Sequence, residues 1–207
     1  MKRHIIILLF ISFNSFSQNF KKSFKQMKDE GILPDYVENL DEKRNNYSNY
    51  YFGVSFDGPD HWQSNLGETE HSILRTYQLD SALSFSIVVI ESQVPKNFDI
   101  WNNISSNIDL IKRQTEQQIS QQFNSKLENF NIKKTYLGGN VAVRTSYNYL
   151  LKSYNGEMDL TYITYQVVKG NFTFTFGLYV PTMFYNYNPN SYERLFGKIR
   201  FITIKSF

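Results

Sequence analysis

Residues 141–178 read VAVRTSYNYLLKSYNGEMDLTYITYQVVKGNFTFTFGL. Apolar or aromatic side chains alternate with polar ones through most of this stretch, and that two-residue period is typical of β-strands with one buried face. Asn155-Gly156 and Gly170-Asn171 interrupt the alternation, and both pairs tolerate the positive φ angles of two-residue hairpin turns. The stretch therefore predicts a three-stranded antiparallel meander.

Further strands are expected on the N-terminal side of the meander. Runs rich in β-branched and aromatic residues, bounded by turn residues, occur at 51–56, 73–78, 83–90 and 130–136. In the third run, odd-numbered positions from Leu83 to Val89 are apolar, so one face of that strand should be buried.

Two helices are expected as well. From Ile100 to Phe123, isoleucines recur at three- and four-residue steps, which predicts one amphipathic helix capped by Asn97 or Asp99. Pro189 opens a closing helix that carries Leu195, Ile199 and Ile202 on one side. Strands and helices in this order indicate an α+β protein.

The order of these elements resembles the PsbP-like fold. The cues are the run Tyr51-Phe52-Gly53-Val54-Ser55-Phe56, Pro59 and Trp62 after it, the Gly138-Gly139 turn into a long strand, and the closing Ile204-Lys205-Ser206-Phe207. The resemblance covers residues 47–207. It implies a central antiparallel β-sheet flanked by helices on both faces, an α/β/α sandwich, and it implies binding or assembly roles rather than catalysis.

The N-terminus has the pattern of a secretory signal peptide. A basic start precedes the apolar run Ile5–Phe13, and small residues precede a cleavage site near Ser17-Gln18. We therefore expect a signal peptide at 1–17, a polar arm with a short helix at 18–46, and the folded domain at 47–207. The arm is either a mobile connector or a segment that docks on a partner or on the domain. The mature protein should be periplasmic or secreted, and without a membrane span.

Composition excludes several classes of function. The 207 residues contain no cysteine, which excludes disulfides, cysteine-ligated metals and a lipid anchor of the bacterial lipoprotein type. Removal of the signal peptide takes away Lys2 and Arg3 and no acidic residue, so the net charge of +3 falls to +1. So little charge does not predict nucleic-acid binding.

The histidines give one alternative. His61 and His71 lie among Asp57, Asp60, Glu68 and Glu70, and imidazole with carboxylates is a metal-binding combination. No recognised ligand spacing or nucleophile motif accompanies them, so we predict no metal, no cofactor and no catalytic residue. A metal-dependent or hydrolytic enzyme that uses His61 or His71 stays open as an alternative.

Residues 183–189, MFYNYNP, are expected to form an aromatic loop just after a strand, and this loop contains the candidate binding residues Tyr185 and Tyr187. Exposed tyrosine rings can stack on a sugar or seat a partner protein. Alternatively, these rings cover the edge between the last strand and the closing helix.

The sequence thus favours an exported, non-catalytic binding or assembly module of the cell envelope, with an envelope protein or a glycan as its partner. A carbohydrate-binding module is the second alternative to this interpretation.

Overall fold

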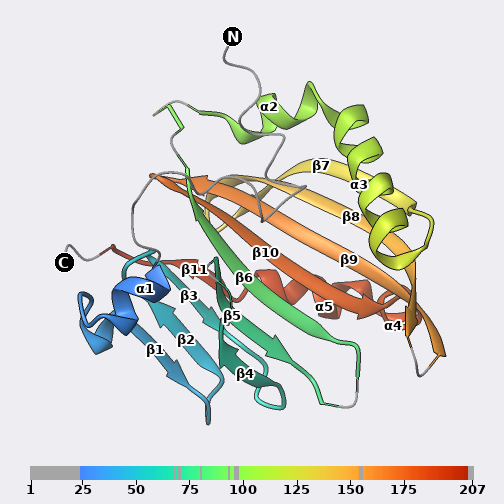
Figure 1. The fold of residues 1–207 in the computed structure, drawn as a ribbon. Coiled ribbons are helices and arrows are strands. Elements are labelled where there is room, and N and C mark those ends of the chain that lie inside the picture. Colours follow the sequence, from blue (N-terminus) through green and yellow to red (C-terminus); the bar gives the residue numbers. More distant parts are fainter. Residues whose placement is uncertain are drawn as a thin grey trace.

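The computed structural model describes residues 24–67, 69, 71–79, 81–92, 94–95, 98–153 and 156–204. The predicted signal peptide at 1–17 lies outside the described residues. The strands form two antiparallel sheets, a seven-stranded sheet in the order β4-β5-β6-β10-β9-β8-β7 and a four-stranded sheet in the order β1-β2-β3-β11 (Figure 1).

The large sheet contains the predicted meander. Its strands are β4 (Gln63–Leu66), β5 (Ser72–Tyr77), β6 (Ser84–Glu91), β7 (Glu128–Leu137), β8 (Asn140–Ser153), β9 (Gly156–Lys169) and β10 (Phe172–Pro181). Gly170 takes a φ of 59° between β9 and β10, as a tight hairpin requires. The predicted face of β6 is confirmed, because Phe85 and Ile87 are fully buried.

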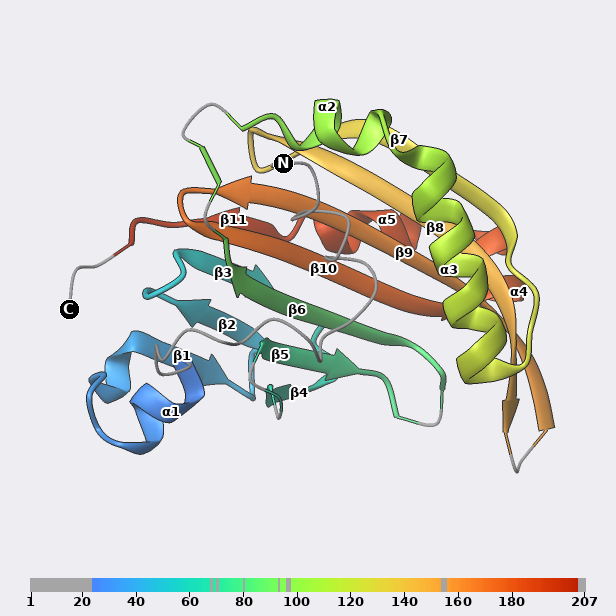
Figure 2. The same ribbon diagram turned by 45° about the horizontal axis from the view of Figure 1, so that its top comes forward.

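One face of the large sheet, the helix face, packs against α2 (Ile100–Ser105) and α3 (Ile108–Phe123). Ile111 clusters with Val143, and Ile119 clusters with Tyr149 and Leu160. Figure 2 shows α2 and α3 above β7, β8 and β9, whereas no helix of the described residues lies over β4, β5 and β6.

The opposite face, the inner face, packs against the small sheet and α5 (Pro189–Phe196). The small sheet comprises β1 (Glu38–Asp41), β2 (Asn46–Asn49), β3 (Val54–Asp57) and β11 (Ile199–Phe201). The rings of Phe56 and Phe85 stack with centroids 4.5 Å apart, and Phe85 also meets Phe196 at 5.7 Å. The α+β class is therefore confirmed. The expected sandwich of one sheet between two helix layers is not confirmed, because a second sheet covers part of the inner face.

The described part of the polar arm, residues 24–46, packs on the domain, which was one of the two alternatives for the arm. The predicted short helix is present as α1 (Phe24–Asp29), and it is followed by the 3-10 helix η2 (Asp35–Val37) and by β1. The Phe24 ring lies 4.8 Å from that of Phe52, and Val37 is fully buried. These apolar anchors bind residues 24–46 to the domain, so this part is neither a solvated connector nor separate from the fold that was expected to begin at residue 47.

Two helix predictions also need correction. The long helix breaks at Ser106 and Asn107, because polar side chains there bond to helix carbonyls: the Asn107 amide donates to the carbonyl of Asn103 at 2.8 Å. The closing helix ends at Phe196, and Ile199 pairs with Phe56 as part of β11 instead of continuing the helix. Among the described residues, no helix combines the length and apolarity needed to cross a membrane.

Candidate binding site

The two predicted binding tyrosines lie on α4 (Thr182–Tyr187), a short helix where a loop was expected. Tyr187 points into solvent and is 92% exposed. Tyr185 is half-buried, and its hydroxyl donates to Glu193 at 2.9 Å and lies 3.1 Å from the Arg144 guanidinium. The two rings therefore differ in role: Tyr187 is exposed, whereas the Tyr185 hydroxyl belongs to a buried polar cluster.

That cluster joins α5 to the inner face of the large sheet. The Nε of Arg144, on β8, donates to Glu193 Oε1 at 3.1 Å, and its Nη1 donates to Ser146 at 2.9 Å. The Tyr165 hydroxyl donates to Glu193 Oε2 at 2.7 Å. The Arg144 side chain is only 8% exposed. We call Arg144, Ser146, Tyr165, Tyr185 and Glu193 the arginine cluster.

The electrostatics of the arginine cluster indicate an anchor rather than a reactive centre. Burial alone would raise the pKa of Glu193, but hydrogen bonds from Arg144 and the two tyrosines outweigh it and keep that pKa below its ordinary value. Burial, followed by the nearby Glu193 carboxylate, raises the pKa of Tyr185. The acid is thus held ionised and the phenol protonated, and each already has a partner.

The histidines are placed apart from any metal-binding cluster within the described residues. His61 is exposed in the turn after Pro59, and the backbone carbonyl of His71 accepts a hydrogen bond from Val89 N at 2.9 Å. Glu68 and Glu70 lie outside the described residues. In the part of the chain that is described, no three His, Cys, Asp or Glu side chains form a group suited to a metal ion.

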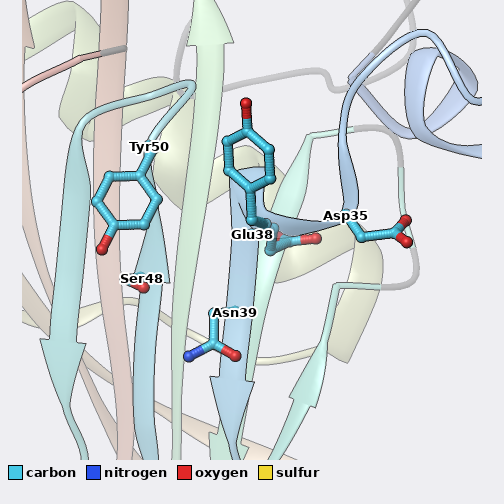
Figure 3. Close-up of a pocket in the computed structure, with 6 residues that line it drawn as sticks. Asp35, Glu38, Asn39, Ser48 and Tyr50 are labelled. Carbon is cyan, nitrogen blue, oxygen red and sulfur yellow. The ribbon is translucent and has the colours of Figure 1, made fainter.

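A hollow of about 390 Å³ lies instead beside the small sheet (Figure 3). The residues that line it come from η2, β1, β2 and the turn after β2: Asp35, Tyr36, Glu38, Asn39, Ser48 and Tyr50. Pro34 precedes η2 and Val37 ends it in the core, which fixes Tyr36 between them. Tyr36 is 61% exposed.

Strand alternation decides which of these side chains face outward. Asn39 and Ser48 are direct cross-strand partners, so both lie on the outer face of the small sheet. Figure 3 shows Ser48 between the ring of Tyr50 and the amide of Asn39, whereas the Asp35 carboxylate points away from these three residues. An amide, a hydroxyl and tyrosine rings therefore border the open side of the hollow.

Glu38 alternates to the other side and is enclosed by donors. Its Oε1 accepts from the Tyr47 hydroxyl at 2.6 Å and from the Asn49 amide at 3.3 Å, and its Oε2 is paired with Lys28. Burial first, and then the charge of Glu38, raises the pKa of Tyr47 well above its ordinary value. Glu38 thus stiffens the wall of the hollow rather than offering a free carboxylate.

These residues are hard to predict from the sequence because they lie in the polar segment 18–46 and at its junction with the rest of the domain. The available signal was the spacing of Leu33, Val37 and Tyr47, which are all buried in the core. Buried anchors on either side of Tyr36 and Asn39 would have indicated a folded segment that presents them.

Comparison with solved structures identifies the fold. The chain resembles cyanobacterial PsbP (CyanoP) from Synechocystis with a TM-score of 0.57 and 14% sequence identity, over 75% of this chain and 91% of CyanoP. A second similar structure is LpqN, involved in cell envelope biogenesis of Mycobacterium tuberculosis, with a TM-score of 0.43 and 7% identity over 71% of this chain and 82% of LpqN. No protein-family model and no curated protein sequence matches the chain. The likeness to CyanoP confirms the PsbP-like fold that the sequence predicts.

Proposed function

We propose that this protein is an exported, non-catalytic binding module of the cell envelope that holds a glycan in the hollow beside the small sheet. The observation that carries the proposal is the lining of that hollow. Tyr36 and Tyr50 contribute rings, and Asn39 and Ser48 contribute an amide and a hydroxyl on the same outer face.

This combination matches the chemistry of a sugar. A sugar ring has apolar C–H faces, which pack on aromatic rings, and hydroxyl groups at its edge, which need both donors and acceptors. An amide supplies both, and so does a hydroxyl. Tyrosine presents a large rigid surface at a low cost in conformational entropy.

The carboxylates support binding rather than hydrolysis. Glycoside hydrolysis in its usual form needs two carboxyl groups that flank the scissile bond. Glu38 is occupied by Lys28, Tyr47 and Asn49, and the Asp35 carboxylate is directed away from Asn39 and Ser48. The signal-peptide pattern at 1–17 supports export to the compartment where envelope glycans are found.

The test is calorimetric titration of the mature chain with a panel of neutral oligosaccharides that includes N-acetylglucosamine oligomers. We expect binding to at least one oligosaccharide without its cleavage. Tyr36→Ala should weaken that binding by about five- to 150-fold, if stacking of a sugar on this ring contributes the about 1–3 kcal/mol that stacking of a base on an aromatic ring does.

Tyr136→Ala is the matched control, because Tyr136 is 66% exposed and lies on β7, in the other sheet. Equal loss of affinity in both variants, or no binding to any oligosaccharide, contradicts the glycan proposal. Cleavage of the bound oligosaccharide contradicts its non-catalytic part.

A second candidate function is the docking of an envelope protein on α4. Three of the six residues of this helix are large, apolar or aromatic, and solvent-exposed: Met183 at 72%, Phe184 at 43% and Tyr187 at 92%. Such a cluster on one short helix favours a protein contact. The double variant Met183→Ser/Tyr187→Ser should abolish capture of that partner protein and leave oligosaccharide binding unchanged, whereas Tyr36→Ala should weaken only oligosaccharide binding.

A further inference from the structure

A row of five polar residues and one glycine crosses the helix face of the large sheet from β4 to β8. Its members are cross-strand partners in successive strand pairs, so they lie on one face: Asn65, Arg75, Ser86, Gly177, Thr164 and Thr145. We call these six residues the polar row. One end lies under α3, and the other end, on β4 and β5, has no helix over it within the described part of the chain (Figure 2).

Arg75 is the charged member of the polar row. It is exposed, and its guanidinium lies 5.9 Å from the centroid of the Tyr77 ring. Its neighbours in the row, Asn65 and Ser86, are neutral, and Arg75 forms no ion pair with the described acidic residues. Arg144 and Arg200, in contrast, each contact a carboxylate. The charge of Arg75 is thus available to a ligand.

At the end of the polar row on β9 and β8, buried hydroxyl groups are left without hydrogen-bond partners among the described residues. Thr164 and Thr145 are 4% and 2% exposed, and within the described residues neither hydroxyl has a hydrogen-bond partner. The side-chain oxygen of Gln114, on α3, is likewise buried without a partner among those residues. Leaving a buried polar atom unpaired costs about 1–3 kcal/mol, so the cross-strand partners Thr164 and Thr145 make this end of the row a polar spot within the sheet.

Gly177 brings hydroxyl groups together in the middle of the row. A Cβ at this position would lie 2.8 Å from the Tyr162 hydroxyl oxygen and 3.4 Å from Ser86 Oγ, so only glycine admits both hydroxyls. Tyr162 stacks on Tyr179 at 4.2 Å. Burial raises the pKa of Tyr179, and the hydrogen bond with Tyr162 and the charge of Arg75 act against that rise.

We propose that Arg75, with the hydroxyl of its cross-strand partner Ser86 beside it, binds the carboxylate or phosphate group of a small polar ligand. A guanidinium fork and a hydroxyl donor are the usual partners of such groups. The site lies on the face of the large sheet opposite the small sheet, so it is independent of the glycan hollow.

The test is NMR titration of the mature chain with three probes: inorganic phosphate, glucuronate, and glucose as the uncharged match to glucuronate. We expect phosphate or glucuronate to shift the amide signals of residues 84–86 and 177–179, and glucose not to shift them. The probe that binds identifies whether the anion is a phosphate or a carboxylate.

Arg75→Gln should weaken that binding at least about tenfold, because a hydrogen bond to a charged group contributes about 1.5–3 kcal/mol. Arg113→Gln is the matched control, since Arg113 is an exposed arginine whose Nε donates only to the carbonyl of Asp109 in its own helix. The proposal is overturned if neither anion shifts these signals, or if both variants weaken binding equally.

Discussion

The arginine cluster and the hollow beside the small sheet are built from the same residue types but differ in what is left exposed. Each centres on a glutamate that accepts a hydrogen bond from tyrosine and is paired with a cation: Glu193 with Arg144, and Glu38 with Lys28. At Glu193, the hydroxyls of both neighbouring tyrosines donate hydrogen bonds to the carboxylate. At Glu38, the next residue along β1, Asn39, points the opposite way and is exposed.

Residue type alone therefore does not mark a binding site. Strand alternation sends Glu38 inward and Asn39 outward, so a fixed acid and an available amide are neighbours in the chain. In the arginine cluster, α5 lies across the sheet and closes over the polar groups, which makes them an anchor. The comparison predicts that damage to the arginine cluster lowers stability, whereas damage to the hollow lowers affinity.

The largest effect is expected for Arg144→Met. This change leaves Glu193 partly buried without its cation, and breaking a buried ion pair costs about 3–5 kcal/mol. Because the Glu193 side chain is 24% exposed, we expect about 2–4 kcal/mol less free energy of unfolding. Urea denaturation measures it. The double variant Arg144→Met/Glu193→Leu should recover most of the loss, and a double variant as unstable as the single one would show that Arg144 acts by packing alone.

A smaller effect is expected in how the stability of the protein falls as the pH is lowered. The pKa of Glu193 is lowered in the folded protein, so its stabilising contribution is present above the ordinary carboxyl pKa of about 4.3 and is lost as the pH falls through the folded value. Glu193→Gln should therefore flatten the decline of stability below about pH 5, by roughly 1 kcal/mol or less because solvent screens a partly exposed group. Melting temperatures from pH 7 to pH 3 test this, and parallel curves for both proteins would refute it.

The sequence predicted the long elements of the fold because each carries many repeats of one period. Strands β8, β9 and β10 follow from a stretch of 38 residues in which polar and apolar side chains alternate. The break between α2 and α3 escaped prediction because the isoleucine spacing continues across Asn107, and only its side-chain hydrogen bond to Asn103 reveals it. The spacing of Leu195, Ile199 and Ile202 fits a helix. The structure instead pairs Ile199 with Phe56 of β3, so that a short strand, β11, forms after α5.

The candidate sites were harder to predict from the sequence. Strand β2 has the sequence NYSN, in which Tyr47 is the one large apolar side chain, so no periodicity marks it as a strand. Without β2, nothing places Ser48 beside Asn39 or Tyr36 near Tyr50. The polar row depends even more on topology, because Arg75 and Thr145 are 70 positions apart in the chain. They lie on the same face only because five strands pair in the order β5-β6-β10-β9-β8.

The smallest effect on stability is expected at the hollow itself, and it tests directly whether the hollow contributes affinity without contributing stability. Tyr36 is 61% exposed and Asn39 is exposed, and surface substitutions of this kind usually change stability by less than about 0.5 kcal/mol. Asn39→Ala and Tyr36→Ala should therefore unfold at the same urea concentration as the unaltered chain, while Asn39→Ala weakens oligosaccharide binding by removing both a donor and an acceptor. A loss above about 1 kcal/mol in Asn39→Ala would mean that Asn39 supports β1 as Arg144 supports α5, and the two regions would then not differ in the way their exposure predicts.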